Sequence, residues 1–174
     1  MEPKKPLSHV VAGLLIAGIV IVISMATMVL TKSAGKPGSG AYTYLIIIGG
    51  LIFFINQFGK ANNYQPTFGE LFSYGFKATA VYTILFIGFL VLFAVIFPDF
   101  KATQLEVART AMENQKGITE EQADKGMEMM EKYFWVFAIG GTTVAFVIIG
   151  TIGSLIGAAV TKKSPKTPFE QLPQ

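Results

Sequence analysis

Long uncharged hydrophobic runs alternate with short polar stretches along this chain. The uncharged runs cover residues 10–30, 41–58, 78–97 and 133–160. In a helix the first, third and fourth runs each extend about 30 Å or more, which is the thickness of a hydrocarbon core. The pattern therefore predicts helices that cross a membrane. The second run is the shortest and has Asn56 and Gln57 near its end, so the sequence leaves open whether it crosses the membrane or only dips into it.

The third helix is expected to begin before its uncharged run. Thr67-Phe68-Gly69-Glu70 has the form of a capping box, with Thr67 as the N-cap and Glu70 three residues later. A helix over 68–97 is longer than a perpendicular crossing requires. We therefore expect residues 68–77 at the membrane surface and residues 78–97 inside the membrane.

The segment 98–131 is the only part that resembles a soluble protein. Pro98-Asp99 stops the preceding helix, and the segment holds eight acidic and four basic residues. Apolar residues recur at helical spacing in its first half, where Gly117 is the expected C-cap. Thr119 and Gln122 then form a second capping box, and the helix that they start leads into the last run. The segment is expected to form a hairpin of amphipathic helices.

Composition supports the same fold class. The chain is 52% hydrophobic and 14% charged, whereas soluble domains carry about 25% charged residues. We predict an all-α membrane protein, with residues 1–174 as a single domain. Its transmembrane helices cover 10–30, 41–58, 68–97 and 133–160, and the amphipathic hairpin 98–131 lies between the third and fourth.

The basic residues suggest an orientation. They flank the apolar runs, which explains the net charge of +3 more simply than a nucleic-acid surface does. Four crossings place Lys4, Lys5, Lys60, Lys77, Lys162, Lys163 and Lys166 on one side, and Lys32, Lys36, Lys101, Arg109, Lys116, Lys125 and Lys132 on the other. The numbers are equal. Because the tight clusters lie directly beside the first and last runs, we favour both termini in the cytoplasm.

Few residues suggest chemistry. The chain has no cysteine and a single histidine, His9, which argues against thiolate sites, transition-metal sites and a Ser–His–Asp set. No charged side chain lies within an uncharged run, so a proton-coupled transporter is disfavoured. The acids of 98–131 do not follow an EF-hand pattern. We expect no enzyme activity, no metal and no cofactor.

One polar patch is a candidate binding site. Glu70, Tyr74 and Lys77 recur at i, i+4 and i+7, so they share one face of the third helix near the membrane surface, and Asn56 lies across the preceding loop. These residues could bind a lipid head group or a small ligand. The simpler interpretation is a capping Glu70 and a Lys77 that extends to the interface.

The last run carries a stripe of small residues, which permits close helix packing. The stripe consists of Gly141, Ala145, Gly150, Gly153 and Gly157. Its partner is either the first run, which contains Ala12, Gly13, Ala17 and Gly18, or a second copy of the chain. We favour packing within one chain.

Several motifs resemble a known family. They are FGELFSYGFK at residues 68–77, IFPD at 96–99 and IGTIGSLIGAAVTKK at 149–163. On these motifs the chain resembles, over nearly its whole length, the bacterial membrane-protein family catalogued as domain of unknown function 4199. The resemblance implies a four-span protein of the bacterial inner membrane. It implies no activity and no catalytic residues.

Two classes of function remain. The first is a non-enzymatic structural, accessory or partner-binding membrane protein, in which the 98–131 hairpin meets a membrane-protein partner or a homo-oligomer forms. The second is a small carrier or lipid-handling protein that acts through an oligomer or through the patch around Glu70. The absence of charge within the runs favours the first class.

Overall fold

The computed structural model describes residues 6–31, 41–115 and 117–164, and in this part of the chain the regular structure is all helix, with no strand. The helices are α1 (His9–Thr31), α2 (Ala41–Ala61), α3 (Phe68–Ile96), α4 (Phe100–Glu113), α5 (Glu120–Lys132) and α6 (Phe134–Val160). Four of these, α1, α2, α3 and α6, are long and apolar enough to cross a membrane. The all-α class, with a helical hairpin between the third and fourth long helices, is confirmed.

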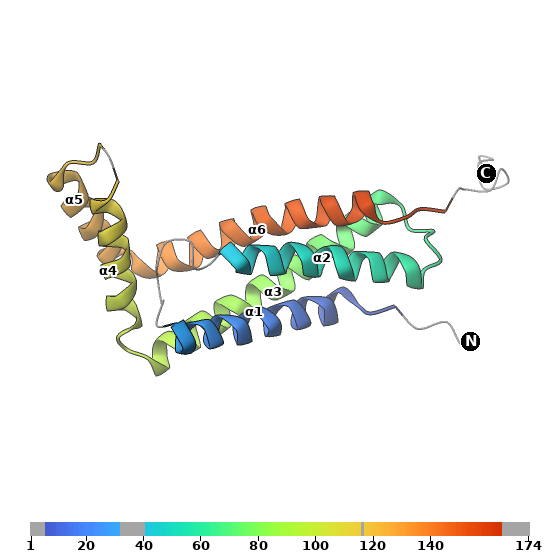
Figure 1. The fold of residues 1–174 in the computed structure, drawn as a ribbon, viewed down its shortest axis with the longest axis horizontal. Helices are drawn as coiled ribbons and strands as arrows, with labels where there is room; N and C mark the ends of the chain where they lie inside the picture. The colour runs from blue at the N-terminus through green and yellow to red at the C-terminus, as the bar shows by residue number, and fades with distance from the viewer. Residues whose placement is uncertain (1–5, 32–40, 116, 165–174) are drawn as a thin grey trace.

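The long helices lie side by side in a bundle (Figure 1). Helices α1 and α3 begin at one end of the bundle, and α2 and α6 end there; we name it the termini end. The opposite end, which carries α4 and α5, is named the hairpin end. Helix α3 packs extensively on α1 and α6, and α2 packs on α6 and less extensively on α1. Helix α4 runs at a steep angle to the bundle (Figure 1) and makes few contacts with it.

Local chemistry explains where two of the helices, α3 and α5, begin. Thr67 caps α3, and its backbone N–H donates to Glu70 Oε2 at 2.7 Å. Thr119 and Gln122 cap α5 in the same way. Both predicted capping boxes are confirmed. Because each box satisfies backbone donors that the first helical turn leaves unpaired, it fixes the start of the helix.

Two predicted helix ends are wrong. Helix α2 continues past residue 58 to Ala61, because Gly59 is buried and its Cα lies close to the Thr161 side chain, so it packs instead of ending the helix. The C-cap of α4 is Asn114, not Gly117. Gly117 lies in the following turn with a φ of 95°, a conformation that glycine adopts without strain.

The turn between α2 and α3 is tied to the end of α6. Asn63 and Tyr64 have φ angles of 54° and 58°, which are uncommon for residues with a side chain. Ser164 holds both, because its hydroxyl donates to Asn63 O at 2.9 Å and its N–H donates to Tyr64 O at 2.8 Å. The turn is thereby fixed beside the last residues of α2.

Burial divides the bundle into two halves. The termini half comprises residues 9–20, 47–61, 68–83 and 146–160, and the hairpin half comprises 21–31, 41–46, 84–96 and 134–145. The largest fully buried side chains belong to the termini half: Tyr82, Ile16, Ile47, Leu51, Ile55 and Leu71. In the hairpin half, among the side chains that the structure describes, only Phe134 is buried.

The small-residue stripe of α6 faces α2 and α3. A Cβ on Gly153 would lie 3.3 Å from Ile48 Cα of α2, and one on Gly157 would lie 3.3 Å from Ile52 Cα. A Cβ on Gly150 would overlap the Thr79 side chain of α3. Ala145 is half-buried, and a Cβ on Gly141 would have no neighbour within 4 Å.

The stripe packs within the chain, on α2 and α3, and the first run, which was one of the two partners considered, is not its partner. Helix α1 instead brings Gly13 against Ala78 O and Val81 of α3. Small residues show where a backbone can approach closely, but they do not show which helix approaches.

Candidate functional site

A cavity of about 530 Å³ opens at the termini end, where the start of α1, the end of α2 and the first turns of α3 meet. Polar side chains from all three segments contribute to its wall. The lining residues are Pro6, Leu7, Ser8, His9, Phe58, Asn62, Pro66, Gly69, Glu70, Ser73, Tyr74 and Lys77. The cavity is therefore a place where a ligand would meet polar groups beside an apolar bundle.

Helix α3 supplies the charged part of the wall. Glu70, Tyr74 and Lys77 all line the cavity, so the structure brings together three of the four residues of the predicted patch. Ser73 lies between them in the sequence and lines it as well. The spacing of these residues follows the helical period, which places them on one face of α3.

Asn56 does not line the cavity, and Asn62 lines it instead. Asn62 directly follows α2, and because its N–H still donates to Phe58 O at 3.2 Å, it continues the face of the helix that carries Phe58. Asn56 precedes Phe58 by two residues, which is a rotation of about 200° around the helix axis. Asn62 comes close because α2 continues past its predicted end. Its amide nitrogen donates to Phe58 O at 2.8 Å.

Tyr74 joins the three segments of the wall. Its side chain is buried, and its hydroxyl donates to Leu7 O at 3.0 Å, just before α1 begins. Its ring stacks on Phe58 of α2 at a centroid distance of 4.3 Å, and the His9 ring meets it edge-on at 6.4 Å. These contacts fix the position of α1 and α2 relative to α3, so the wall is formed before any ligand arrives.

Glu70 and Lys77 differ in their bonding. Glu70 Oε2 accepts from Thr67 N at 2.7 Å and from Thr67 Oγ1 at 2.9 Å, so the capping interpretation of Glu70 is confirmed, although Glu70 also lines the cavity. Lys77 is exposed. Within the described part of the chain, no carboxylate forms an ion pair with it. Lys77 is therefore a cation available to a ligand.

Sequence reasoning missed His9, because a single histidine suggests no metal or catalytic site. A usable signal was present in the sequence. His9 directly precedes the first uncharged run, and Lys77 directly precedes the third. Two polar residues that each mark the edge of an apolar run are expected at the same depth in a membrane. The cavity brings both together.

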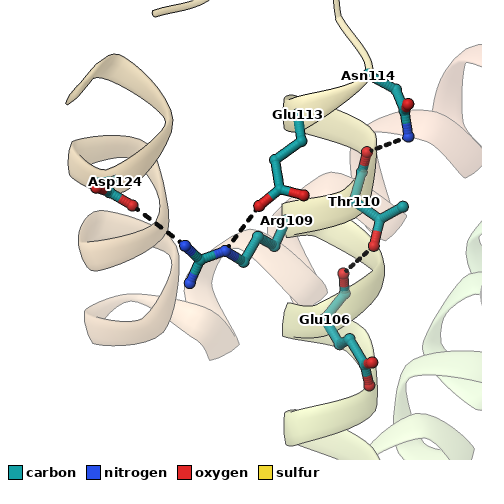
Figure 2. Close-up of polar contacts among 6 residues, drawn as sticks. All are labelled: Glu106, Arg109, Thr110, Glu113, Asn114 and Asp124. Carbon is teal, nitrogen blue, oxygen red and sulfur yellow. Dashed lines mark hydrogen bonds and ion pairs between the residues drawn. The ribbon is translucent and has the colours of Figure 1, made fainter. Parts of the chain in front are cut away.

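The hairpin holds a second polar cluster, shown in Figure 2. Arg109 of α4 bonds Glu113 Oε1 through Nε at 3.0 Å and Asp124 Oδ1 of α5 through Nη2 at 3.5 Å. The Glu113 carboxylate, followed by Asp124, raises the pKa of Arg109 above its ordinary value. All three side chains are more than half exposed, so this cluster joins the two helices weakly.

No set of three or more His, Asp or Glu side chains in residues 6–31, 41–115 and 117–164 is arranged to hold a metal ion. The fold and the cavity together define a class of protein: an all-α bundle suited to a membrane location, with a polar cavity at one end. The chain belongs to the family described as "Protein of unknown function (DUF4199)", which matches residues 12–163. No curated protein and no solved structure matches it.

Proposed function

We propose that this chain is a non-enzymatic, multi-pass protein of a bacterial inner membrane that binds the polar head group of a membrane lipid in its termini-end cavity. The observation that carries the proposal is the cavity itself, which brings His9 of α1 together with Ser73 and Lys77 of α3. This geometry favours lipid handling over a purely structural role, because a packing element does not need such a cavity.

The depth of the cavity supports a lipid ligand. Lys77 is the last charged residue before the uncharged run 78–97, which in a helix extends about 30 Å, the thickness of the hydrocarbon core. His9 holds the corresponding position before residues 10–30. The cavity wall therefore lies at the boundary between hydrocarbon and head groups. A lipid of the adjacent leaflet would reach it without leaving the membrane.

The wall offers binding groups and no arrangement typical of catalysis. Its histidine contacts the Tyr74 ring, and Ser8 Oγ accepts a hydrogen bond from Val11 N at 3.2 Å as a helix cap. No cysteine exists in the chain. A nucleophile paired with a base, which covalent catalysis requires, is not found among the described lining residues.

Basic residues support a cytoplasmic location of the termini end. Lys60 and Lys77 lie there, and Lys162 and Lys163 follow α6 with their ammonium groups over the Tyr64 and Phe68 rings at 6.0 and 5.2 Å. Positive residues close to crossing helices favour the cytoplasmic side. A reporter enzyme that works only in the cytoplasm, fused after Gln174, should be active; activity only of an extracytoplasmic reporter would reverse the orientation.

Native mass spectrometry of the purified full chain tests head-group binding. The wild type should retain phospholipid at a collision energy that strips the micelle, and Ser73→Trp, which fills the cavity, should lose it. Phe76→Trp is the matched control, because Phe76 is on α3, exposed and outside the cavity. Equal lipid retention by both variants and the wild type would refute the proposal.

A second candidate function is partner binding by the α4–α5 hairpin. It is favoured because the hairpin makes few contacts with the bundle and α5 exposes acidic side chains such as Glu128 and Glu131. The proposed partner is a membrane protein with a basic surface. Cross-linking in native membranes through residues substituted on α5 should capture such a partner; capture of lipid only, or of a second copy, would reject a foreign partner.

A further inference from the structure

We infer that helix α4 lies in the plane of the membrane surface at the hairpin end, with the face that carries Phe100, Val107 and Ala111 toward the lipid acyl chains. The partner of this face is the lipid of the leaflet opposite the cavity. The inference rests on the membrane location in the proposed function, but not on head-group binding in the cavity.

The first residue of α4 lies at the depth where the third and fourth uncharged runs meet charged residues. The Phe100 ring contacts the Phe93 ring of α3 at a centroid distance of 5.5 Å and the Phe134 ring of α6 at 6.4 Å. In the sequence, charges resume close to these rings, at Asp99 after α3 and at Lys132 before α6. Because charged side chains are costly within hydrocarbon, the two charges mark its boundary. Helix α4 therefore begins at the membrane surface.

The direction of α4 keeps the rest of the helix near this depth. Helix α4 runs at a steep angle to the bundle (Figure 1), whereas a helix that projected into water would continue the direction of α3. Its 14 residues extend about 21 Å. This length therefore runs along the membrane surface instead of away from it.

The two faces of α4 differ in chemistry. Val107 and Ala111 follow Phe100 at i+7 and i+11, so they share the face that begins against the bundle, and Gln104 is the polar residue of this face. The opposite face carries exposed charged side chains, namely Glu106, Arg109 and Glu113. An amphipathic helix at a membrane surface places its apolar face among the acyl chains and its polar face in water. Both requirements are met by the direction in which the Phe100 face points.

Protein contacts do not explain what holds α4 in place. The structure describes every residue of α4, and none of them is buried. The ion pair from Arg109 to Asp124 of α5 is largely exposed and therefore weak. An isolated helix of about 14 residues is marginally stable in water. Lipid contact would bury the apolar face of α4, and this face continues the apolar surface of α3 and α6, where Ile96 and Val136 are exposed at the same end.

Tryptophan fluorescence of the full chain in phosphatidylcholine vesicles tests this inference. Trp135→Phe first removes the single tryptophan of the chain. In that background, Ala111→Trp should lose most of its emission when the acyl chains are brominated, and Ala102→Trp should keep most of its emission. The two positions are a matched pair, because both alanines are exposed on α4 and lie nine residues, or about two and a half turns, apart on opposite faces. Acrylamide in the water should quench the two variants in the reverse order.

A third variant separates failure of this inference from failure of the membrane location. Leu92→Trp places the probe on α3, at a position that is 58% exposed within the third uncharged run, and brominated lipid should quench it. If lipid quenches Leu92→Trp while acrylamide alone quenches Ala111→Trp, α4 stands in water and the inference is overturned with the proposed function intact. Protection of Ala111→Trp from both quenchers would place a protein surface on this face and would also overturn it. Equal lipid quenching at the two alanine positions would overturn the assignment of the faces. Lipid quenching of neither Leu92→Trp nor Ala111→Trp would overturn the membrane location itself.

Discussion

The two halves of the bundle are built differently. In the termini half the helices approach closely, and Leu51, Ile55 and Leu71 are fully buried between them. In the hairpin half, α3 and α6 expose large side chains such as Val95 and Val136. There, aromatic rings follow one another from α3 into the hairpin and α6, in the series Phe86, Phe89, Phe93, Phe100, Phe134 and Trp135.

Small residues explain the difference. Gly150, Gly153 and Gly157 let α6 approach α2 and α3, and Gly13 lets α1 approach α3. Lipid gives no hydrophobic drive for association, so close contact of this kind is what holds apolar helices together. Gly88 and Gly141 lie in the hairpin half, and a Cβ on either would meet nothing within 4 Å. The cavity is thus built on the tightly packed half, where its wall is held rigid.

The largest expected effect comes from filling a helix contact in the termini half. Gly150→Leu should lower the free energy of unfolding by about 3 kcal/mol, because its side chain has no room beside Thr79 and Tyr82. Gly141→Leu, on the same helix but with open space, should change it by less than about 0.5 kcal/mol. Denaturant titration in detergent measures both. Equal losses would show that the two halves are packed alike.

Truncating a large side chain should show the same contrast between the two halves, with a smaller loss of stability. Leu51→Ala removes a fully buried side chain and should cost about 2 kcal/mol. Leu92→Ala removes a side chain that is 58% exposed and, under the proposal, faces lipid. Its unfolding midpoint should stay near that of the wild type. A larger loss for Leu92→Ala would mean that the hairpin half is covered by another protein surface.

A single buried hydrogen bond in the termini half should contribute less to the free energy of unfolding than the side chains above. The Tyr82 hydroxyl donates to Phe146 O at 3.0 Å between α3 and α6. Tyr82→Phe should therefore cost about 1 kcal/mol, the usual range for such bonds between membrane helices. Tyr44→Phe, an exposed tyrosine of the hairpin half, serves as the control. No loss in Tyr82→Phe would show that this bond does not hold the termini half together.

The smallest effect is expected at the hairpin. Arg109→Gln removes the ion pair that joins α4 to Asp124, but these side chains are largely exposed. Amide hydrogen exchange should become faster in α4 and α5 and stay unchanged in α3 and α6. High salt should produce the same change in the wild type. Faster exchange in the bundle itself would show that the hairpin stabilises it.

Sequence reasoning found the features that depend on local chemistry. The long uncharged runs became α1, α2, α3 and α6, and the boxes at Thr67 and Thr119 became helix starts. Both signals lie within one segment of the chain.

The sequence does not predict features that depend on how a helix is rotated and on which helices lie beside it. The choice of Asn62 over Asn56 depends on α2 continuing past Gly59, which requires Thr161 to pack against it. Which helices contact the small-residue stripe of α6 is decided by how all four long helices pack together. The position of His9 at the edge of the first run is visible in the sequence, but its contact with the Tyr74 ring depends on how α1 packs on α3.

The most direct test of head-group binding is to map where a photoactivatable phosphatidylethanolamine, with its reactive group next to the phosphate, attaches to the full chain. Peptide mass spectrometry should find attachment concentrated on residues 6–9 and 69–77, and Lys77→Gln should remove most of it. Attachment spread evenly over the exposed faces of α1, α3 and α6, unchanged by Lys77→Gln, would contradict the account.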